Sequence, residues 1–170
     1  TRAGTAVTHD AAETVKRVTL ELGGKSPNIV FADCDLKAMV TASVQECMFN
    51  TGQSCDAPTR LLVERSCYDE ALKIVKIAAE AVEVGDPEKE GDHLGPLFDE
   101  IQFERVQNMI SVGINEGASL LVGGLGKPEG YEKGWFVKPT IFVDVSNDQR
   151  IAQEEIFGPV LVVIPFEDEA

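Results

Sequence analysis

The stretch VLVVIPF, residues 160–166, is the longest strongly apolar run in the chain. Seven residues are far too few to cross a bilayer, because a membrane-spanning helix needs about 20. A short, uninterrupted apolar run is typical of a strand that is buried on both faces, as in a parallel sheet covered by helices. The stretch therefore predicts a buried strand in an α/β domain.

Further strand-like and helix-like segments alternate ahead of this run. Short apolar or alternating stretches predict strands at residues 17–24, 28–32, 60–65, 119–124 and 136–145. Apolar spacing of three and four residues predicts helices at 5–17, 36–48, 68–83 and 99–116, with Asp35 and Asp99 at two of the starts. Interleaved helices and strands predict an α/β fold with a mostly parallel sheet flanked by helices.

Composition and charge limit the possible partners. The chain has 170 residues, 44% of them hydrophobic, which is enough for one domain with a substantial core. Twenty-nine acidic and fifteen basic residues give a formal charge of −14, which opposes binding to phosphate backbones and anionic lipids. We therefore expect no nucleic-acid partner and no membrane partner. No charged-then-apolar signal pattern opens the chain, so a cytoplasmic location is expected.

The cysteines and histidines argue against a metal site or a disulfide framework. The four cysteines, at positions 34, 47, 55 and 67, lack paired metal-ligand spacing, and a chain of this size does not need disulfides. Only two histidines are present, which excludes a histidine-rich metal site and makes a Cys/His hydrolase a weak alternative. Cys47 falls on the apolar stripe of a predicted helix and is expected to fill the core, whereas Cys34 and Cys67, beside strands, are expected to be packed or incidental rather than catalytic.

Cys55 stands apart from the other cysteines. It lies in FNTGQSCDAPTR, residues 49–60, a loop of small and polar residues that follows a predicted helix. Backbone N–H groups can converge in such a loop, where they would stabilise a thiolate and the oxyanion formed when that thiolate attacks a carbonyl. On the loop alone, a nucleophilic thiol and an incidental loop cysteine remain equal alternatives.

A second candidate is Glu21 in ELGGKSP, residues 21–27. The sequence places it at the end of a predicted strand, beside glycines that allow close approach to the backbone. Partial burial there would raise its pKa and make it a better general base near neutral pH. An ordinary surface glutamate beside a turn is the alternative. For Lys25, in the same motif, a solvated lysine is expected.

Taken with EEIFGPV at residues 154–160, these two motifs resemble those of the NAD(P)-dependent aldehyde dehydrogenase superfamily. The family carries its glutamate in an E-L-G-G-K/S type run and its nucleophile in F-x-x-x-G-Q-x-C. This chain has ELGGK and FNTGQSC, 34 residues apart from Glu21 to Cys55, and GWFVKPTIF at 134–142 is similar to another family segment. The likeness extends over nearly the whole chain.

The resemblance implies a role for four residues. Cys55 would attack the aldehyde carbonyl to give a thiohemiacetal, from which hydride passes to the nicotinamide of NAD or NADP and leaves a thioester. Glu21 would activate the water that hydrolyses the thioester. Glu155 would hydrogen-bond the nicotinamide-side ribose, and Phe157 would pack near that ribose. The implied partner is a small-molecule aldehyde, and the parent enzyme is expected to be a homo-oligomer.

The resemblance also implies that the chain is the thiol-bearing catalytic domain of an aldehyde dehydrogenase-like fold. Residues 1–17 would be the remnant of a coenzyme-domain helix and 18–170 the catalytic domain, with the coenzyme domain and the C-terminal arm absent. The isolated chain is therefore expected to be inactive as a dehydrogenase. The alternative is a non-catalytic binding or structural module that keeps a reactive thiol, and an unrelated cysteine hydrolase or acyltransferase is disfavoured.

Overall fold

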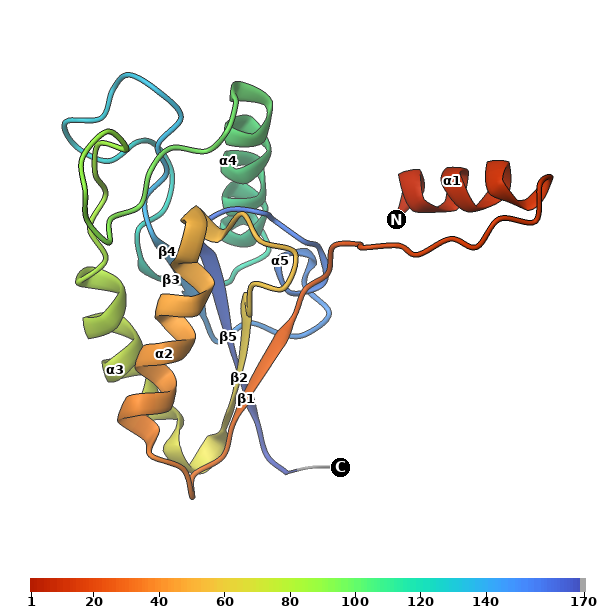
Figure 1. The fold of residues 1–170 in the computed structure, drawn as a ribbon. Helices are drawn as coiled ribbons and strands as arrows, with labels where there is room; N and C mark the ends of the chain where they lie inside the picture. Colours follow the sequence, from red (N-terminus) through yellow and green to blue (C-terminus); the bar gives the residue numbers. More distant parts are fainter. Residues whose placement is uncertain (169–170) are drawn as a thin grey trace.

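A computed structural model describes residues 1–168 as an α/β body with an N-terminal arm (Figure 1). The body contains a five-stranded sheet in the order β1-β2-β5-β4-β3. Its strands are β1 (Pro27–Val30), β2 (Arg60–Glu64), β3 (Ser119–Val122), β4 (Thr140–Val143) and β5 (Val160–Phe166). The four strands β1, β2, β5 and β4 are parallel, and β3 joins the edge antiparallel to β4. The predicted fold class is therefore confirmed.

Helices cover both faces of this sheet. The helices are α1 (Arg2–Ala12), α2 (Leu36–Met48), α3 (Tyr68–Glu80), α4 (Glu100–Asn115) and the short α5 (Arg150–Gln153). One core joins α2 and α3 to one face of the sheet, and a second core joins α4 and α5 to the other face. None of the helices in the described part of the chain has the length and apolar character that a bilayer crossing requires.

Strand β5 lies inside the sheet with apolar side chains on both of its faces. Leu161 and Val163 belong to the core under α2 and α3, whereas Val160 and Val162 belong to the core under α4. All four residues are fully buried, because β5 has β2 on one side and β4 on the other. The uninterrupted apolar run thus predicted the buried strand correctly.

Two helix starts follow from local chemistry. The Asp35 carboxylate accepts a hydrogen bond from the Ala38 N–H at 3.1 Å, and the Asp99 carboxylate accepts one from the Gln102 N–H at 2.8 Å. Each bond satisfies one of the backbone donors that a helix leaves free in its first turn. Both predicted N-caps are confirmed. The predicted stripe on α2 is mostly buried, but Met39 is 47% exposed.

The N-terminal arm differs most from the sequence prediction. The helix ends at Ala12 rather than at 17, because the chain turns back at Val15, whose φ is +53°. Residues 17–24 form no strand, since no other strand in the described chain lies beside them to supply ladder hydrogen bonds. This segment instead runs back along α1, where Leu20 and Leu22 contact Gly4. Figure 1 shows the arm extending away from the body.

Strands β3 and β4 are shorter than predicted. Strand β3 stops at Val122 because Gly123 adopts a φ of +77°, and β4 is limited to Thr140–Val143 after two prolines upstream in the turn region. The acidic segment at 85–96 is a loop that is exposed at residues 87–92, and one isolated bridge joins Val84 to Leu94. The predicted domain end at residue 170 lies outside the described residues.

Candidate active site

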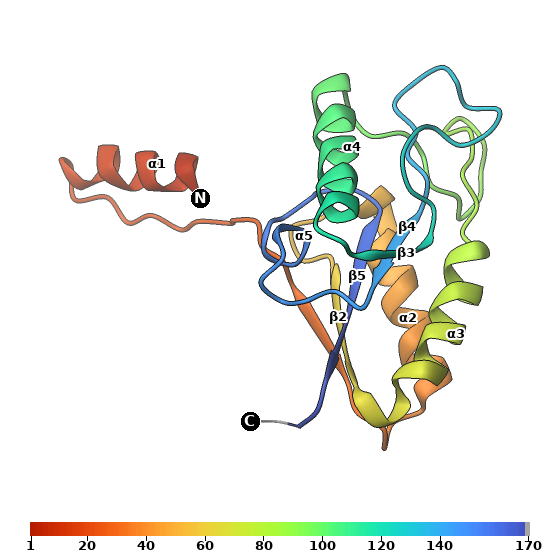
Figure 2. The ribbon, with the colours of Figure 1, turned by 180° about the vertical axis from the view of Figure 1, so that it is seen from behind.

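The three sequence motifs converge at the end of the sheet where strands β1, β2 and β5 begin. Residues 21–26 lead into β1, residues 49–59 lead into β2, and residues 154–159 lead into β5. These three strands are neighbours and parallel, with Pro27 opposite Arg60 and Arg60 opposite Val162, so their amino ends lie side by side. Open α/β sheets usually bind ligands at the carboxyl ends of the strands. Here the motifs lie at the opposite end of the strands, the amino end, as can be followed in Figure 2.

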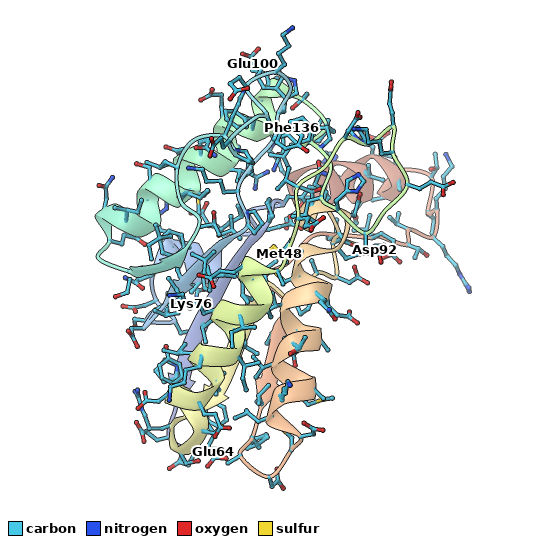
Figure 3. The ribbon with its side chains drawn as sticks, turned by 90° about the vertical axis from the view of Figure 1, so that its left-hand side faces the viewer. Met48, Glu64, Lys76, Asp92, Glu100 and Phe136 are labelled. Carbon is cyan, nitrogen blue, oxygen red and sulfur yellow. The ribbon has the colours of Figure 1, made fainter. Side chains whose placement is uncertain are left out.

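The cysteine loop begins with an abrupt change of direction at the end of α2. Asn50, Thr51 and Gly52 have φ values of +50°, +58° and +70°, so three consecutive residues adopt the left-handed region. Gln53 stabilises the turn, because its N–H and its side-chain amide both donate to the Asn50 carbonyl, at 3.1 and 3.2 Å. In Figure 3, Met48 marks the end of α2 from which this loop departs, away from Glu64 at the far end of β2.

The loop is fastened to the rest of the body by two further hydrogen bonds. The Thr51 hydroxyl donates to the Gly95 carbonyl at 3.1 Å, and the Gln53 side-chain oxygen accepts from the Phe98 N–H at 3.1 Å. Thr51 and Gly52 are buried, although Asn50 just before them is exposed. These contacts hold the segment that immediately precedes Cys55 in one conformation.

Cys55 itself is exposed. Within the described residues its N–H makes no hydrogen bond, so this donor is free to meet a ligand. The residues on either side, Ser54 and Asp56, are joined by a hydrogen bond of 2.5 Å from hydroxyl to carboxylate, which lowers the pKa of Asp56. Both line a surface pocket of about 500 Å³ that also includes Phe49 and Glu46 of the α2 end. Cys55 itself is not among the residues that line this pocket.

The cysteine loop packs directly against the third motif. A Cβ placed on Gly52 would lie 2.1 Å from the carbonyl oxygen of Gly158, which is backbone and cannot move aside. Gly52 therefore has to be glycine for two reasons, its left-handed φ and this contact. Cys55 follows Gly52 by three residues, which places its Cα within roughly 11 Å of that contact.

The third motif also contacts the first. A Cβ placed on Gly23 would lie 2.0 Å from Oε2 of Glu155, so the Glu155 carboxylate occupies the space that a side chain at 23 would need. Glu21 precedes Gly23 by two residues and so has its Cα within roughly 7 Å of it. The loop at 154–159 is thus in contact with both of the other motifs.

Helix α4 holds this loop in place through one of its faces. Gln102 donates through Nε2 to the carbonyls of Ile156 and Phe157, at 2.9 and 2.8 Å, and Arg105 donates to the carbonyl of Glu155 at 2.7 Å. Phe157 has a φ of +59°, an uncommon conformation for a bulky residue, which these bonds maintain. Sequence reasoning did not single out Gln102 or Arg105, although their three-residue spacing on a capped helix was available as a signal.

Lys25 is the clearest departure from the sequence prediction. The sequence favoured a solvated lysine, but Lys25 is 9% exposed and its Nζ is buried without a hydrogen-bond partner among the described residues. Burial lowers its pKa to about 8, against a usual 10.5. The prediction was wrong because burial depends on tertiary packing: Gly24 is exposed, but Lys25, two residues before β1, is buried.

Glu21 is exposed and makes no hydrogen bond within the described residues. The partial burial considered from the sequence is therefore not found in this chain. Its place on the arm that leads to β1 keeps it near Gly23 and hence near Glu155. No hydrogen bond joins Glu21 to Cys55, and both side chains are open to solvent.

The other cysteines have the structural surroundings that were predicted. Cys47 is fully buried in the α2 core, and burial raises the pKa of its thiol to about 12. Cys34 and Cys67 are partly buried and pack against the same core, and burial raises the pKa of Cys67. Phe136 is buried, and the partly buried Trp135 packs against the α4 core. Among the four thiols, Cys55 alone is exposed.

Comparison with known proteins agrees with this arrangement of motifs. The family model described as the aldehyde dehydrogenase family matches residues 1–170. This chain belongs to the aldehyde dehydrogenase family. The resemblance drawn from ELGGK, FNTGQSC and EEIFGPV is thereby confirmed at the level of the family.

Relatives within the family are similar along nearly the whole of this chain. A 3-succinoylsemialdehyde-pyridine dehydrogenase from a Pseudomonas species is 51% identical over 169 residues, covering 99% of this chain and 35% of the relative. The crystal structure of an aldehyde dehydrogenase from Bartonella henselae has a TM-score of 0.95 and 49% identity, covering 99% of this chain and 35% of that one. This aldehyde dehydrogenase chain therefore spans about a third of the length of its relatives.

A further similar structure contains ligands. It is a cysteine-to-alanine variant of aldehyde dehydrogenase C from Pseudomonas syringae, in complex with NAD⁺ and octanal. Its TM-score is 0.95 at 48% identity, and the match covers 98% of this chain and 34% of that one. At this level of identity the two share a fold, and the bound molecules belong to that relative.

Proposed function

We propose that this chain supplies the catalytic thiol of an aldehyde dehydrogenase that oxidises a small-molecule aldehyde to a carboxylic acid with NAD. The observation that carries the proposal is the contact of the loop at 154–159 with both Gly23 and Gly52. That loop contacts both the motif that contains Glu21 and the motif that contains Cys55, at the end of the sheet where their strands begin. Membership of the family and the NAD⁺ complex of a close relative support the same reaction.

Cys55 is proposed as the nucleophile. Its exposed sulfur can reach an aldehyde carbon, and its unpaired N–H is placed to donate to the oxygen that becomes negative on attack. The C–S bond that forms turns the aldehyde into a thiohemiacetal, in which the former carbonyl carbon carries one hydrogen. Loss of that hydrogen as hydride leaves a thioester on Cys55.

Glu21 is proposed as the general base of the second step. Its carboxylate would take a proton from water as the water oxygen attacks the thioester carbon, and the C–S bond then breaks to release the acid and restore the thiol. Exposure to solvent gives Glu21 ready access to water. A carboxylate that lies outside the Cys55 loop can act at this step without blocking the attack on the aldehyde.

The residues of the 154–159 loop fit a nicotinamide nucleotide. Glu155 has one oxygen, Oε1, that is buried without a partner among the described residues, and both of its oxygens lie against Gly23, so the carboxylate is held in place. Glu155 would accept hydrogen bonds from the ribose hydroxyls, and Phe157, held at its uncommon φ by Gln102, would pack against the ribose. When bound, NAD supplies the hydride acceptor.

We also propose a division of the chain at residue 17. Residues 1–17, which include α1, stand away from the body and would belong with a coenzyme-binding part, whereas 18–170 would form the catalytic domain (Figure 1). Because the chain spans 35% of its relatives, we propose that it reacts at Cys55 but does not turn over NAD by itself. The full enzyme is proposed to be a cytoplasmic homo-oligomer.

The direct test uses an enzyme of the length of the relatives that carries this chain. Absorbance at the NADH wavelength should rise with an aldehyde and NAD⁺. Cys55→Ala should abolish this rise, whereas Glu21→Gln should allow one burst of NADH per site and then stall, because the thioester persists. Normal turnover in the Cys55→Ala enzyme would overturn the proposal.

A further inference from the structure

Two buried polar atoms near the predicted coenzyme site have no hydrogen-bond partner in the described chain. One is Nζ of Lys25 and the other is Oε1 of Glu155. Native proteins leave few buried polar groups unpaired, because each loses its hydrogen bonds to water without replacement. A lysine and a glutamate left in this state close to one another therefore call for an explanation beyond ordinary packing.

Lys25 and Glu155 interact through their charges. The groups that act on Lys25 are the Cys47 thiol on α2, the Arg60 guanidinium on β2 and the Glu155 carboxylate. Glu155 favours the protonated lysine, whereas Arg60 disfavours it. The lysine and glutamate are not within direct ion-pair distance, so the attraction acts across a gap. Because Lys25 is buried, water screens this attraction poorly.

The backbone between these groups restricts the carboxylate further. Gly23 lies two residues before Lys25 and against the carboxylate, since its Cβ position is 2.0 Å from Oε2 and 2.3 Å from Oε1. The carbonyl of Glu155 is fixed by Arg105, so the residue cannot shift as a unit. The carboxylate is thus confined between the Gly23 backbone and the field of a buried ammonium group.

Resting on the function proposed above, we infer that Lys25 is a positioning residue for the coenzyme. Its ammonium group attracts the Glu155 carboxylate and keeps it against Gly23. The carboxylate is thereby held where it can accept hydrogen bonds from the vicinal hydroxyls of a ribose. Lys25 does not touch the reacting atoms, and it acts through Glu155.

The first test measures the coupling between the two residues without any coenzyme. In this chain, labelled at lysine Cε, NMR titration should give Lys25 a pKa near 8, and Glu155→Gln should lower that pKa because it removes the favourable charge. Glu154→Gln is the matched control, since the neighbouring Glu154 pairs with Arg150 at 2.9 Å and does not act on Lys25. An unchanged Lys25 pKa in Glu155→Gln would overturn the inference.

The second test measures the effect on the coenzyme in the full-length enzyme that carries this chain. Lys25→Met, which keeps an apolar stem of similar size but removes the ammonium group, should raise KM for NAD⁺ about tenfold with a smaller effect on kcat. Glu155→Gln should raise it at least as much. An unchanged KM in Lys25→Met together with a raised KM in Glu155→Gln would overturn the role proposed for Lys25 but leave the role proposed for Glu155 intact. If neither variant changes KM, the proposed role of Glu155 is wrong as well.

Discussion

Gly23 and the carboxylate of Glu155 occupy adjoining space, so that a Cβ at position 23 would lie 2.0 Å from Oε2. These residues are far apart in the sequence and meet because their segments lead into β1 and β5, two parallel strands with only β2 between them. The same loop touches Gly52 of the cysteine segment through the Gly158 carbonyl. In each contact the glycine leaves space that a side chain would fill, which its place in a sequence motif does not reveal. Substitution of either glycine therefore has a predictable steric cost.

Substitution of Gly23 should displace the Glu155 carboxylate. In Gly23→Ala the new methyl group overlaps a side-chain end that Gly23 and Lys25 confine, so NAD⁺ binding by the full-length enzyme should weaken about tenfold. Gly24→Ala is the matched control, because nothing lies within 4 Å of its Cβ position. Equal dissociation constants for the two variants, measured by titration of protein fluorescence, would contradict this account.

Substitution of Gly52 should destabilise the fold itself. Gly52→Ala combines a φ of +70° with a collision against the Gly158 backbone, and should cost about 3–5 kcal/mol of unfolding free energy. Gly130→Ala separates the two causes, since Gly130 has a φ of +82° in open space and should cost only about 1–2 kcal/mol. Urea unfolding of this chain measures both values. A similar cost for the two variants would mean that the backbone at Gly158 shifts to accommodate the new methyl group at little cost.

Removal of the Gln102 amide should release the loop at 154–159. Gln102→Leu leaves the buried carbonyl of Ile156 and the partly buried carbonyl of Phe157 without this donor, and should cost about 2–4 kcal/mol. Glu104→Gln is an exposed change on the same helix and should stay within about 0.5 kcal/mol of the unaltered chain. Urea unfolding again gives the measurement. A loss below about 1 kcal/mol for Gln102→Leu would show that the loop is held mainly by packing.

The four thiols should react with an alkylating agent in an order set by their surroundings. Cys55 is exposed and should be labelled first by iodoacetamide at pH 7.5. Cys47, which is buried and has its pKa raised to about 12, should react only when the chain unfolds. Peptide mass spectrometry over a time course gives each rate. Labelling of Cys47 as fast as Cys55 in the folded chain would contradict the structure.

Lys25 should make stability rise between pH 8 and 10.5. Its pKa is lowered from 10.5 to about 8 in the folded chain, so across this window the unfolded state binds more protons and each rise in pH favours folding. The full shift corresponds to about 3 kcal/mol. Cys47 acts in the opposite direction between pH 9 and 12, because its folded pKa is raised. Subtracting the unfolding free energy of Lys25→Met from that of the unaltered chain at each pH isolates the contribution of the lysine.

That difference in unfolding free energy, measured with urea at several pH values, should grow in favour of the unaltered chain as the pH increases. It should reach its full size near pH 10.5, where the unfolded lysine also loses its proton. A flat difference between pH 8 and 10.5 would mean that Lys25 is solvated in solution. It would also remove the buried charge on which its positioning role depends.

The sequence by itself determined the fold class, the family and the candidate residues. The apolar run of β5, the capped helices and three motifs in order are local patterns, and local patterns are what periodicity and residue chemistry encode. The burial of Cys47 and the exposure of Cys55 also followed from the spacing around each thiol. The ends of α1 and the absence of a strand at 17–24 did not, because strand formation depends on a neighbour that local pattern cannot supply.

Only the tertiary structure decided that the motifs meet at the amino ends of β1, β2 and β5. Strand order and register depend on contacts between distant segments, so no local pattern could place Glu155 against Gly23 or bury Lys25 beside them. The same holds for Gln102, whose function appears only when α4 crosses the loop at 154–159. The physical reason is that side-chain burial and charge coupling belong to the packed arrangement, whereas helix caps and apolar stripes belong to the chain itself.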